Sequence, residues 1–473
     1  MMEASNMKEA AKPKLGLLGL MAGGYEPVFP GITKRQSDYA RELVDAVAET
    51  VELVFDEPAT DRKSAERIVK GYNSRDDLDG ILIVLLTYHQ GSWILRALQE
   101  NNLPIALALV QPDQRIGTDW DELRLTVNQG IHGAQDNANT IVRLGLKCQF
   151  FVGNRLEKEF PDFVTDFAKA AQTRRALRNM RVAVLGRMQG MNDILTDDMA
   201  FFSKIGPEFC HETLGSVHSA MMKVEKTEIE ASISRDQETF EVDPKLTWAS
   251  HAEATRMYLG FRKFLEERGY AAFTAQFDHF AEDGRFRQLP LMAASHLMAD
   301  GYGYAAEGDI MCATMVAAGH VITDGGANFT EMYTIDFEQE HIIFCHAGEG
   351  NWATCRKDQK PRLIDRFLGE GGLENPPTPI FTPEYGRATL TSLVSLGGEK
   401  FRLVVAKGEI LPKTDMVNCE MPYIFFKPDS GVRPCVTGWL RNGGTHHEVI
   451  NLGDCANRWR MLCDMLDVEY VEV

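Results

Sequence analysis

The sequence lacks the features of secreted, membrane-spanning and phosphate-binding proteins. Its nine cysteines occur singly, with no CxxC pair, whereas a secreted disulfide scaffold is usually short and dense in cysteine. No apolar run approaches the roughly 20 residues that a membrane-spanning helix needs. Residues 1–14 are polar and rich in Ala and Lys, unlike a signal peptide. We therefore expect a cytoplasmic protein that has no membrane partner.

The sequence also contains fewer basic than acidic residues. Lys and Arg number 50 against 68 Asp and Glu, which gives a formal net charge of -18. Such a surface repels nucleic acids and anionic membranes, so we expect neither as a partner. The motifs GxxxxGK(S/T) and HExxH are both missing, which argues against a P-loop nucleotide site and against the commonest zinc sites.

What the sequence does contain is typical of a folded chain of two or three domains, given its 473 residues with 44% apolar and 25% charged side chains. In the first third, short apolar runs alternate with helical patterns, which predicts the βαβα order of a doubly wound sheet. The predicted strands are Leu15–Met21, Val51–Phe55, Gly80–Tyr88, Ile105–Gln111 and Phe150–Gly153. The predicted helices are Lys34–Glu49, Lys63–Tyr72, Gly91–Glu100 and Asp136–Leu144.

A second α/β unit is expected to begin near Arg181, where a new apolar run starts. The elements expected in it are helices at Asp197–Ile205, Ser250–Arg268 and Leu289–Asp300 and a strand at Ala272–Phe277. Beyond about Gly319 the pattern changes to short β-rich runs, which favour an antiparallel sheet or barrel.

Glu307 is the first candidate for chemistry. It precedes Asp309, which we expect to cap a helix over Ile310–Ala318 that stops at Gly319. An ordinary solvated loop carboxylate is the alternative interpretation of Glu307, because most surface glutamates have no special role.

Glu331 is the second candidate. If Phe329–Phe337 is a strand, Glu331 is the only charge on a face that it shares with Tyr333 and Ile335. A buried carboxylate costs several kcal/mol unless it is paired or binds a metal. A structural ion pair with an arginine is the alternative to a metal site.

Three histidines complete the candidate set. His346 follows an alternating apolar run, and His446 and His447 are adjacent in the segment GGTHHE. Adjacent side chains on an extended segment point in opposite directions, so we expect only one of this pair to be a ligand. A lone histidine on an apolar face more often belongs to the core. Taken together, however, two carboxylates and one or two imidazoles suit Mn²⁺, Co²⁺ or Mg²⁺.

These elements, in this order and spacing, resemble the L-arabinose isomerase family. The segments that also match in kind are Thr126–Gly133, Ala272–Phe277, Gln288–Pro290 and Gly443–His447. The resemblance spans nearly the whole chain, and its most specific part is the EGD element combined with GGxxHH. It implies a Rossmann-like parallel α/β domain over 14–178, a central α/β domain over 179–322 and a β-rich, barrel-like domain over 323–473.

By this resemblance Glu307, Glu331, His346 and His447 hold a divalent metal, with Mn²⁺ as the first expectation and Co²⁺ or Mg²⁺ as alternatives. Glu307 and Glu331 are jointly expected to carry out the proton transfers. The residues that the resemblance implies as substrate contacts are His446, Gln129, His132, Met21, Tyr88, Phe277 and Met188. Gln129 and His132 are expected to serve a neighbouring subunit, in a trimer-based homo-oligomer that is commonly a hexamer.

The implied activity is aldose–ketose isomerisation, an intramolecular oxidoreduction in carbohydrate metabolism that acts on a pentose or related sugar through an enediolate. A metal-dependent sugar epimerase, a non-catalytic sugar-binding or regulatory protein and a metal-dependent hydrolase are the alternatives. The chain departs from the family where Met21 replaces a sugar-contacting glutamine, and at Leu86–His89 and His346–Glu349. L-Arabinose is therefore only one candidate substrate.

Overall fold

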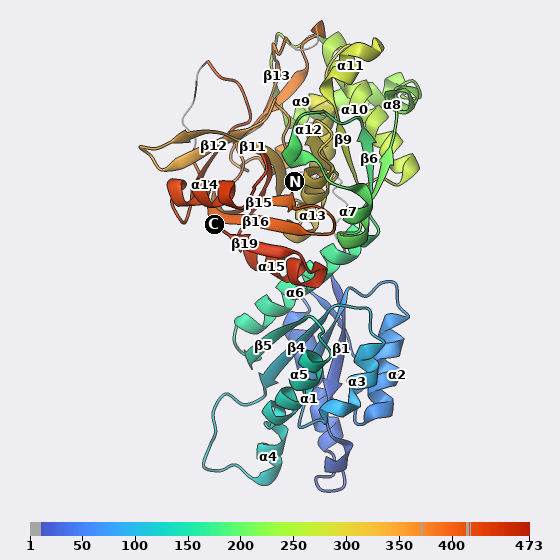
Figure 1. Ribbon diagram of the computed structural model, residues 1–473, viewed down its shortest axis with the longest axis vertical. Coiled ribbons are helices and arrows are strands. Elements are labelled where there is room, and N and C mark those ends of the chain that lie inside the picture. Colours follow the sequence, from blue (N-terminus) through green and yellow to red (C-terminus); the bar gives the residue numbers. More distant parts are fainter. Residues whose placement is uncertain (1–10, 370–371, 413–415, 417) are drawn as a thin grey trace. The chain divides into compact units, whose positions relative to one another are not determined.

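The structure, a computed structural model, describes residues 11–369, 372–412, 416 and 418–473 (Figure 1). The chain packs into two compact units. Residues Ala11–Arg175 and Asn457–Asp467 form the N-terminal unit, and Ala176–Ala456 and Val468–Val473 belong to the second unit. Residues 1–10, on which most of the expectation about the polar N-terminus rests, lie outside the described part. Among the described residues, no helix has the length and apolar character needed to cross a membrane.

The N-terminal unit is built on a five-stranded parallel sheet in the order β2-β1-β3-β4-β5. The strands are β1 (Lys14–Leu20), β2 (Glu52–Val54), β3 (Gly80–Leu85), β4 (Ile105–Gln111) and β5 (Cys148–Asn154). The helices are α1 (Ile32–Val47), α2 (Arg62–Asn73), α3 (Leu95–Gln99), α4 (Glu122–Val127), α5 (Gly130–Arg143), α6 (Glu159–Arg178) and α15 (Ala456–Leu466). All six residues of β3 are buried, as the continuous apolar run predicted. The predicted parallel α/β architecture is confirmed.

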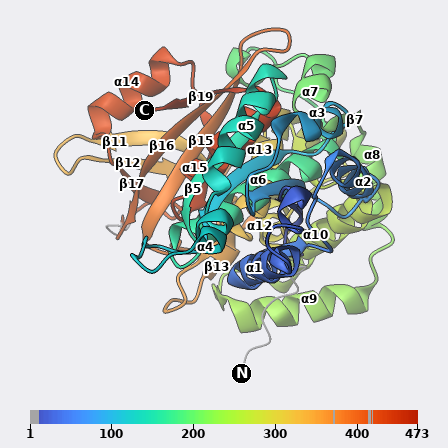
Figure 2. The ribbon, with the colours of Figure 1, turned by 90° about the horizontal axis from the view of Figure 1, so that it is seen from below.

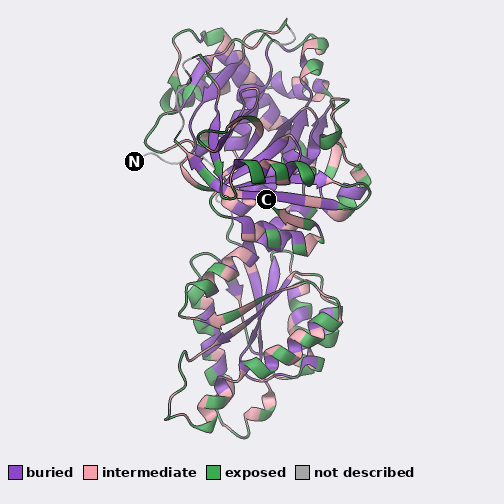
Figure 3. Cartoon of the chain, turned by 60° about the vertical axis from the view of Figure 1, so that its left-hand side comes forward, coloured by how far each residue is buried: buried purple, intermediate pink, exposed green. Residues whose placement is uncertain are grey.

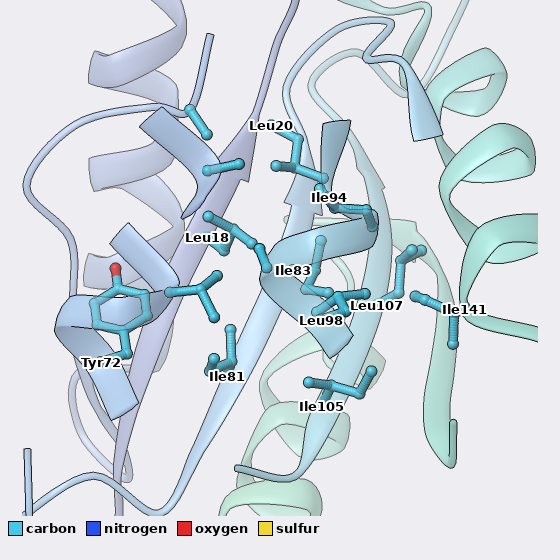
Figure 4. Close-up of a cluster of buried hydrophobic side chains, with 14 of the residues drawn as sticks. Leu18, Leu20, Tyr72, Ile81, Ile83, Ile94, Leu98, Ile105, Leu107 and Ile141 are labelled. Atoms are coloured by element: carbon cyan, nitrogen blue, oxygen red, sulfur yellow. The ribbon is translucent and has the colours of Figure 1, made fainter. Parts of the chain in front are cut away.

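The core of this unit lies between the sheet and the helices that cover it. Figure 4 shows Leu18, Ile83 and Leu107 of three neighbouring strands meeting Leu98 and Ile141 of the helices. The ring of Tyr72 packs on the backbone of β1, where a Cβ at Gly16 would lie 2.6 Å from it. Gly16, in the glycine-rich sequence of the first strand, is thus explained by close packing against Tyr72.

Two predicted helices differ from the observed ones. α5 begins at Gly130 rather than Asp136, because its glycines allow the helix to lie against the end of β3: a Cβ at Gly130 would be 2.8 Å from the carbonyl oxygen of Leu85. The predicted helix Gly91–Glu100 is split into a 3₁₀ turn, η2 (Gly91–Trp93), and the short α3.

The second unit contains a four-stranded parallel sheet in the order β10-β9-β6-β7. Its strands are β6 (Arg181–Leu185), β7 (Glu208–His211), β9 (Ala272–Ala275) and β10 (Gly303–Ala306). The helices that accompany it are α7 (Asp198–Lys204), α8 (Leu214–Met221), α9 (Lys226–Thr239), α10 (Trp248–Arg268), α11 (Phe277–Asp283), α12 (Leu291–Ala299) and α13 (Ile310–Thr323). In Figure 3 the strands are largely buried and the outer helix faces are exposed.

Six antiparallel strands of the second unit close into a barrel in the order β15-β18-β11-β12-β17-β16, with β16 pairing back onto β15. The strands are β11 (Ala327–Asp336), β12 (His341–Cys345), β15 (Gly386–Ser395), β16 (Phe401–Leu411), β17 (Ile424–Pro428) and β18 (His447–Leu452). β19 (Glu469–Glu472) adds to β16 in parallel. Helix α14 (Val432–Arg441) contributes Val432, Cys435 and Trp439 to a buried cluster with side chains of the barrel strands. The ribbon of the barrel strands and of α14 is seen from below in Figure 2. The predicted C-terminal barrel is confirmed.

A small sheet, β14-β13-β8, completes the second unit. Its strands are β8 (Glu241–Val242), β13 (Arg362–Asp365) and β14 (Pro377–Ile380). The expected domain boundaries at 178 and 322 stay a prediction. The segment Asn457–Asp467, which was expected to belong to the C-terminal domain, packs with the N-terminal unit: Arg458 Nε lies 2.8 Å from Asp166 Oδ1.

Two local expectations in the second unit are wrong. α13 continues past Gly319 to Thr323, because that glycine serves close packing: a Cβ there would lie 2.7 Å from the Cβ of Ala327. The regular alternation expected along Phe329–Phe337 is broken by a register shift between Met332 and Thr334. Tyr333, beyond the start of this bulge, is 62% exposed, so the apolar face does not continue.

Candidate metal centre and substrate cavity

Strand register brings three of the candidate residues together. Glu331 of β11 pairs with His447 of β18 on one side and with Cys345 of β12 on the other. Residues directly opposite in an antiparallel pair have neighbouring side chains, and His346 comes directly after Cys345. Oε1 of Glu331 lies 3.5 Å from Nε2 of His447 and 3.8 Å from Nε2 of His346.

Glu307 reaches the same place from the parallel sheet. It follows β10, at the carboxyl edge where ligands commonly bind in such sheets, and its Oε2 lies 3.4 Å from Nε2 of His447. Its φ of 65° is unusual for a residue other than glycine. Gly308 then allows the loop after β6 to approach, because a Cβ there would lie 2.7 Å from the carbonyl oxygen of Gly186. This backbone arrangement is the kind of local strain that functional sites retain.

Asp309 links the helix to the histidine. Its Oδ1 accepts a hydrogen bond from the backbone N–H of Cys312 at 2.9 Å, so the predicted N-cap of α13 is confirmed. Its Oδ2 lies 3.0 Å from Nδ1 of the fully buried His447. A carboxylate at Nδ1 orients an imidazole so that Nε2 faces the metal position, as is usual for metal-binding histidines.

A buried carboxylate also lies beside the ring of His346. Its Nδ1 lies 2.9 Å from Oε1 of the buried Glu349, which also accepts a hydrogen bond of 2.9 Å from the Tyr304 hydroxyl. The ring of Phe329 packs against both His346 and His447, at centroid distances of 4.9 and 5.0 Å. The Glu349 carboxylate therefore lies beside Nδ1 of His346 as an ion-pair partner, and Phe329 packs against another side of the ring.

The expectation that His446 and His447 point in opposite directions is wrong. His446 precedes the first residue of β18, and the two ring centroids are only 4.2 Å apart. Nε2 of His446 lies 3.7 Å from Glu307 and 3.8 Å from Glu331. Its Nδ1 and backbone N–H lie 2.7 and 2.9 Å from the Asp193 carboxylate.

Within the described residues, ligand atoms lie close enough for one ion in two overlapping sets. These sets are Glu307 with His346 and His447, and Glu331 with His446 and His447. The two sets together contain the four residues that were predicted as ligands, and they add His446. Ligand atoms in each set lie within 4.8 Å of one another.

The charges of the cluster oppose each other. Burial raises the pKa of Glu307, but the neighbouring imidazoles of His446 and His447 outweigh this effect and hold its pKa well below the usual range. Burial lowers the pKa of His447, yet Asp309, Glu307 and Glu331 together raise it well above the ordinary value. Oε2 of Glu307 and Nε2 of His447 are buried, and neither makes a hydrogen bond with any described residue. Such a pair of atoms fits a cation between them.

A cavity of about 470 Å³ opens beside the cluster. Glu307, Glu331 and His346 line it, and so do Met188 and Phe277, two of the residues expected to contact substrate. The Phe277 ring stacks near His346 at 6.0 Å, and the backbone N–H of Met188 donates to the carbonyl of Glu307 at 2.8 Å. This volume is in the range of small-molecule sites.

The other expected substrate contacts belong to the N-terminal unit. Met21 is buried there. The Tyr88 hydroxyl lies 3.3 Å from Oδ2 of Asp136, Nε2 of Gln129 donates to the Tyr25 hydroxyl at 2.8 Å, and His132 is exposed on α5. Their roles toward a substrate stay predictions.

Three site residues were not found from the sequence. Glu349 carried a usable signal, because it lies three residues after a histidine at the end of an apolar strand. Asp193, in a 3₁₀ turn η3 (Asn192–Ile194), and Arg366, directly after β13, carried none. Asp193 reaches the site through its contact with His446, far along the chain, and Arg366 through its contact with Ala347.

The chain is similar to known L-arabinose isomerases. The sequence pattern of the L-arabinose isomerase central domain matches residues 196–325, and that of the L-arabinose isomerase C-terminal domain matches residues 326–469. The L-arabinose isomerase of Clostridium beijerinckii is 27% identical over 453 residues, covering 94% of this chain and 91% of the relative. That of Nocardioides sp. is 26% identical over 474 residues, covering 93% and 92%.

Proposed function

This chain belongs to the L-arabinose isomerase family, and we propose that it is a divalent-metal-dependent isomerase of a pentose or related sugar. As a member of this family it is an enzyme of the aldose–ketose isomerase class, an intramolecular oxidoreductase. The proposal for the metal rests on one observation. The buried Oε2 of Glu307 and Nε2 of His447 face each other at 3.4 Å without a hydrogen bond, among carboxylates and imidazoles that are suited to a metal.

The residues proposed to hold the ion are Glu307, Glu331, His346 and His447. Their oxygen and nitrogen donors suit Mn²⁺ first, with Co²⁺ or Mg²⁺ as alternatives. A bound divalent ion would act as a Lewis acid toward two neighbouring oxygens of the open-chain sugar. Asp309 and Glu349 support this role, because each places a carboxylate beside Nδ1 of a histidine.

The two glutamates are the groups available for proton transfer. In the isomerisation a proton leaves C2 of the aldose, a proton is added at C1, and a hydroxyl proton moves from O2 to O1 by way of an enediolate. The neighbouring imidazoles outweigh the effect of burial and lower the pKa of Glu307, so it is a carboxylate at neutral pH. His446, which Asp193 holds in place, faces both carboxylates and is proposed to bind a sugar hydroxyl.

The test combines activity with metal binding. The protein is incubated with Mn²⁺ and pentoses, hexoses, deoxysugars or uronic acids, and the products are identified. We expect a ketose to form, and we expect Glu307→Gln and Glu331→Gln each to lower the rate at least 100-fold and to weaken Mn²⁺ binding in a calorimetric titration. The exposed Glu338→Gln is the matched control. An epimeric aldose as the product, or unchanged Mn²⁺ binding in both site variants, would refute the proposal.

We also propose that the enzyme is a trimer-based homo-oligomer in which Gln129 and His132 serve a neighbour's site. The exposure of His132 and of the neighbouring Ile131 on α5 supports this. So does the exposure of Phe150 and Val152 on the edge strand β5. Light scattering after size-exclusion chromatography tests the assembly. A fully active monomer would contradict it.

A further inference from the structure

The substrate cavity is lined by an arginine that pairs with no carboxylate among the residues that the structure describes. Arg366 follows β13 and lies half-buried in the cavity wall with Leu368 and Met421. Its guanidinium donates to the carbonyl oxygen of Ala347, directly after the candidate ligand His346. Among the described residues, no carboxylate lies within 4.0 Å of it.

This arrangement contrasts with the neighbouring arginine of the same strand. Arg362, at the start of β13, lies 3.0 Å from Glu420 at the surface. A half-buried guanidinium without a counter-charge is costly, so its retention in a cavity needs a reason. Asp278 also lines the cavity, but it is exposed, and its carboxylate accepts a hydrogen bond of 3.0 Å from Gln276 rather than pairing with Arg366.

The backbone is shaped to admit this side chain. Gly348 has a φ of 139°, a conformation that other residues rarely adopt. A Cβ at this position would collide with Nη1 of Arg366 and would lie 2.9 Å from the Thr378 side chain. Gly348 therefore leaves the space in which the guanidinium lies in the cavity wall.

From these observations we infer that the preferred substrate is an open-chain aldose that carries an anionic group at the end remote from its carbonyl. This inference rests on the proposed function, in which C1 and C2 are held at Glu307 and Glu331. A carboxylate, a sulfonate or a phosphate shares the required chemistry, because each offers oxygens that match the planar fork of a guanidinium. Arg366 would also offset the repulsion that the two glutamates and the acidic chain exert on an anion.

The kinetic test compares charged and neutral aldoses. Wild-type enzyme is assayed with Mn²⁺ on L-arabinose and D-galactose, on D-galacturonate and D-glucuronate, and on pentose 5-phosphates. We expect kcat/KM to be at least 10-fold higher for one class of anionic sugar than for the neutral sugars. Comparison of the uronic acids with the sugar phosphates shows whether the site prefers a carboxylate or a phosphate. Arg366→Leu should lower kcat/KM for the preferred anionic sugar 10- to 100-fold, mainly through KM, and should change kcat/KM for the neutral sugars less than 3-fold. For Arg366→Lys, kcat/KM for the anionic sugar should lie between the values of wild type and Arg366→Leu. Arg362→Leu is the matched control.

A binding test separates the failure of this inference from failure of the proposed function. Galactonate and galactitol, which have no carbonyl to isomerise and differ in charge, are titrated calorimetrically in EDTA. We expect wild type to bind galactonate at least 10-fold more tightly than galactitol, and Arg366→Leu to remove this difference. If no aldose is converted but this pattern holds, the proposed function fails and the anion site stands. Equal binding of both compounds, or neutral sugars preferred by wild type and Arg366→Leu alike, would overturn the inference.

Discussion

The Nδ1 atom of His447 lies 3.0 Å from Oδ2 of Asp309, whose Oδ1 accepts the backbone N–H of Cys312 at the start of α13. Asp309 and His447 are both almost fully buried. One carboxylate therefore fixes the beginning of a helix in the parallel sheet layer and the orientation of an imidazole on the barrel. The two layers of the second unit meet at the site through this side chain.

Substitutions at Asp309 should separate these two roles. Asparagine is about as good an N-cap as aspartate, but it brings no charge to Nδ1 of His447. We expect Asp309→Asn to weaken Mn²⁺ binding by about 10- to 100-fold and to lower the free energy of unfolding, because the buried ion pair with His447 is lost. Asp309→Ala should weaken binding as much and lower that free energy by about 1 kcal/mol more than Asp309→Asn does, through the additional loss of the cap. Calorimetric titration and urea unfolding measure both quantities; wild-type Mn²⁺ affinity in the alanine variant would contradict the assigned role.

Substitution of Glu349 should lower Mn²⁺ affinity more than substitution of Tyr304, which donates a hydrogen bond to it. Glu349→Gln removes the negative charge beside Nδ1 of His346, so Mn²⁺ affinity should fall by about 10- to 100-fold. Tyr304→Phe removes only the hydroxyl that donates to Glu349. We expect it to cost about 1 kcal/mol of stability and to change Mn²⁺ affinity less than Glu349→Gln does. The reverse order of the two affinities would show that Glu349 does not position His346.

Gly319 tests the close contact between α13 and the barrel. A Cβ there would lie 2.5 Å from Oδ1 of the buried Asn451 and 2.7 Å from the Cβ of Ala327. Gly319→Ala should therefore lower the free energy of unfolding by about 1–3 kcal/mol, although alanine favours helices. Gly215→Ala, in α8 of the same unit, meets no atom nearer than 3.4 Å and should be neutral or stabilising by up to about 1 kcal/mol. Equal effects of the two substitutions would show that the contact at Gly319 is not tight.

The parallel sheet of the N-terminal unit was predictable because strand β3 is buried on both faces. Such a strand must be continuously apolar, and the run from Gly80 to Leu85 has no polar side chain. The Asp309 cap was equally predictable, since capping depends on residues only three positions apart. The C-terminal end of α13 was not predictable. Gly319 does not end the helix but is needed for close packing against Asn451, which lies far along the chain.

Two of the candidate residues drew attention because polar side chains interrupt apolar strands: Glu331 and His346. Glu307 was a candidate from its place before the predicted helix cap, and the resemblance to a family connected these residues with His447. The joint orientation of His446 and His447 could not be inferred, because it depends on where β18 begins. Arg366 gave no sequence signal, since only its place in the cavity distinguishes it from the paired arginines at the surface.

The buried Asp236 gives the stability of the second unit a pH dependence that can be measured. Its two oxygens lie 2.8 Å from Nε2 of His251 and 3.1 Å from Nε2 of His296. Burial raises the pKa of Asp236, but the charge of His296 and the hydrogen bonds of both histidines outweigh this effect and lower its pKa to about 2. Because an unfolded aspartate titrates near 3.9, the carboxylate contributes roughly 2 kcal/mol above that pH, and this contribution is lost as the pH falls from about 4 toward 2. Asp236→Asn should cost about 3–5 kcal/mol at pH 7, and the difference from wild type should narrow as the pH falls from about 4 toward 2 in chemical unfolding. A difference that stays constant over this range would show that Asp236 does not carry the charge assigned to it.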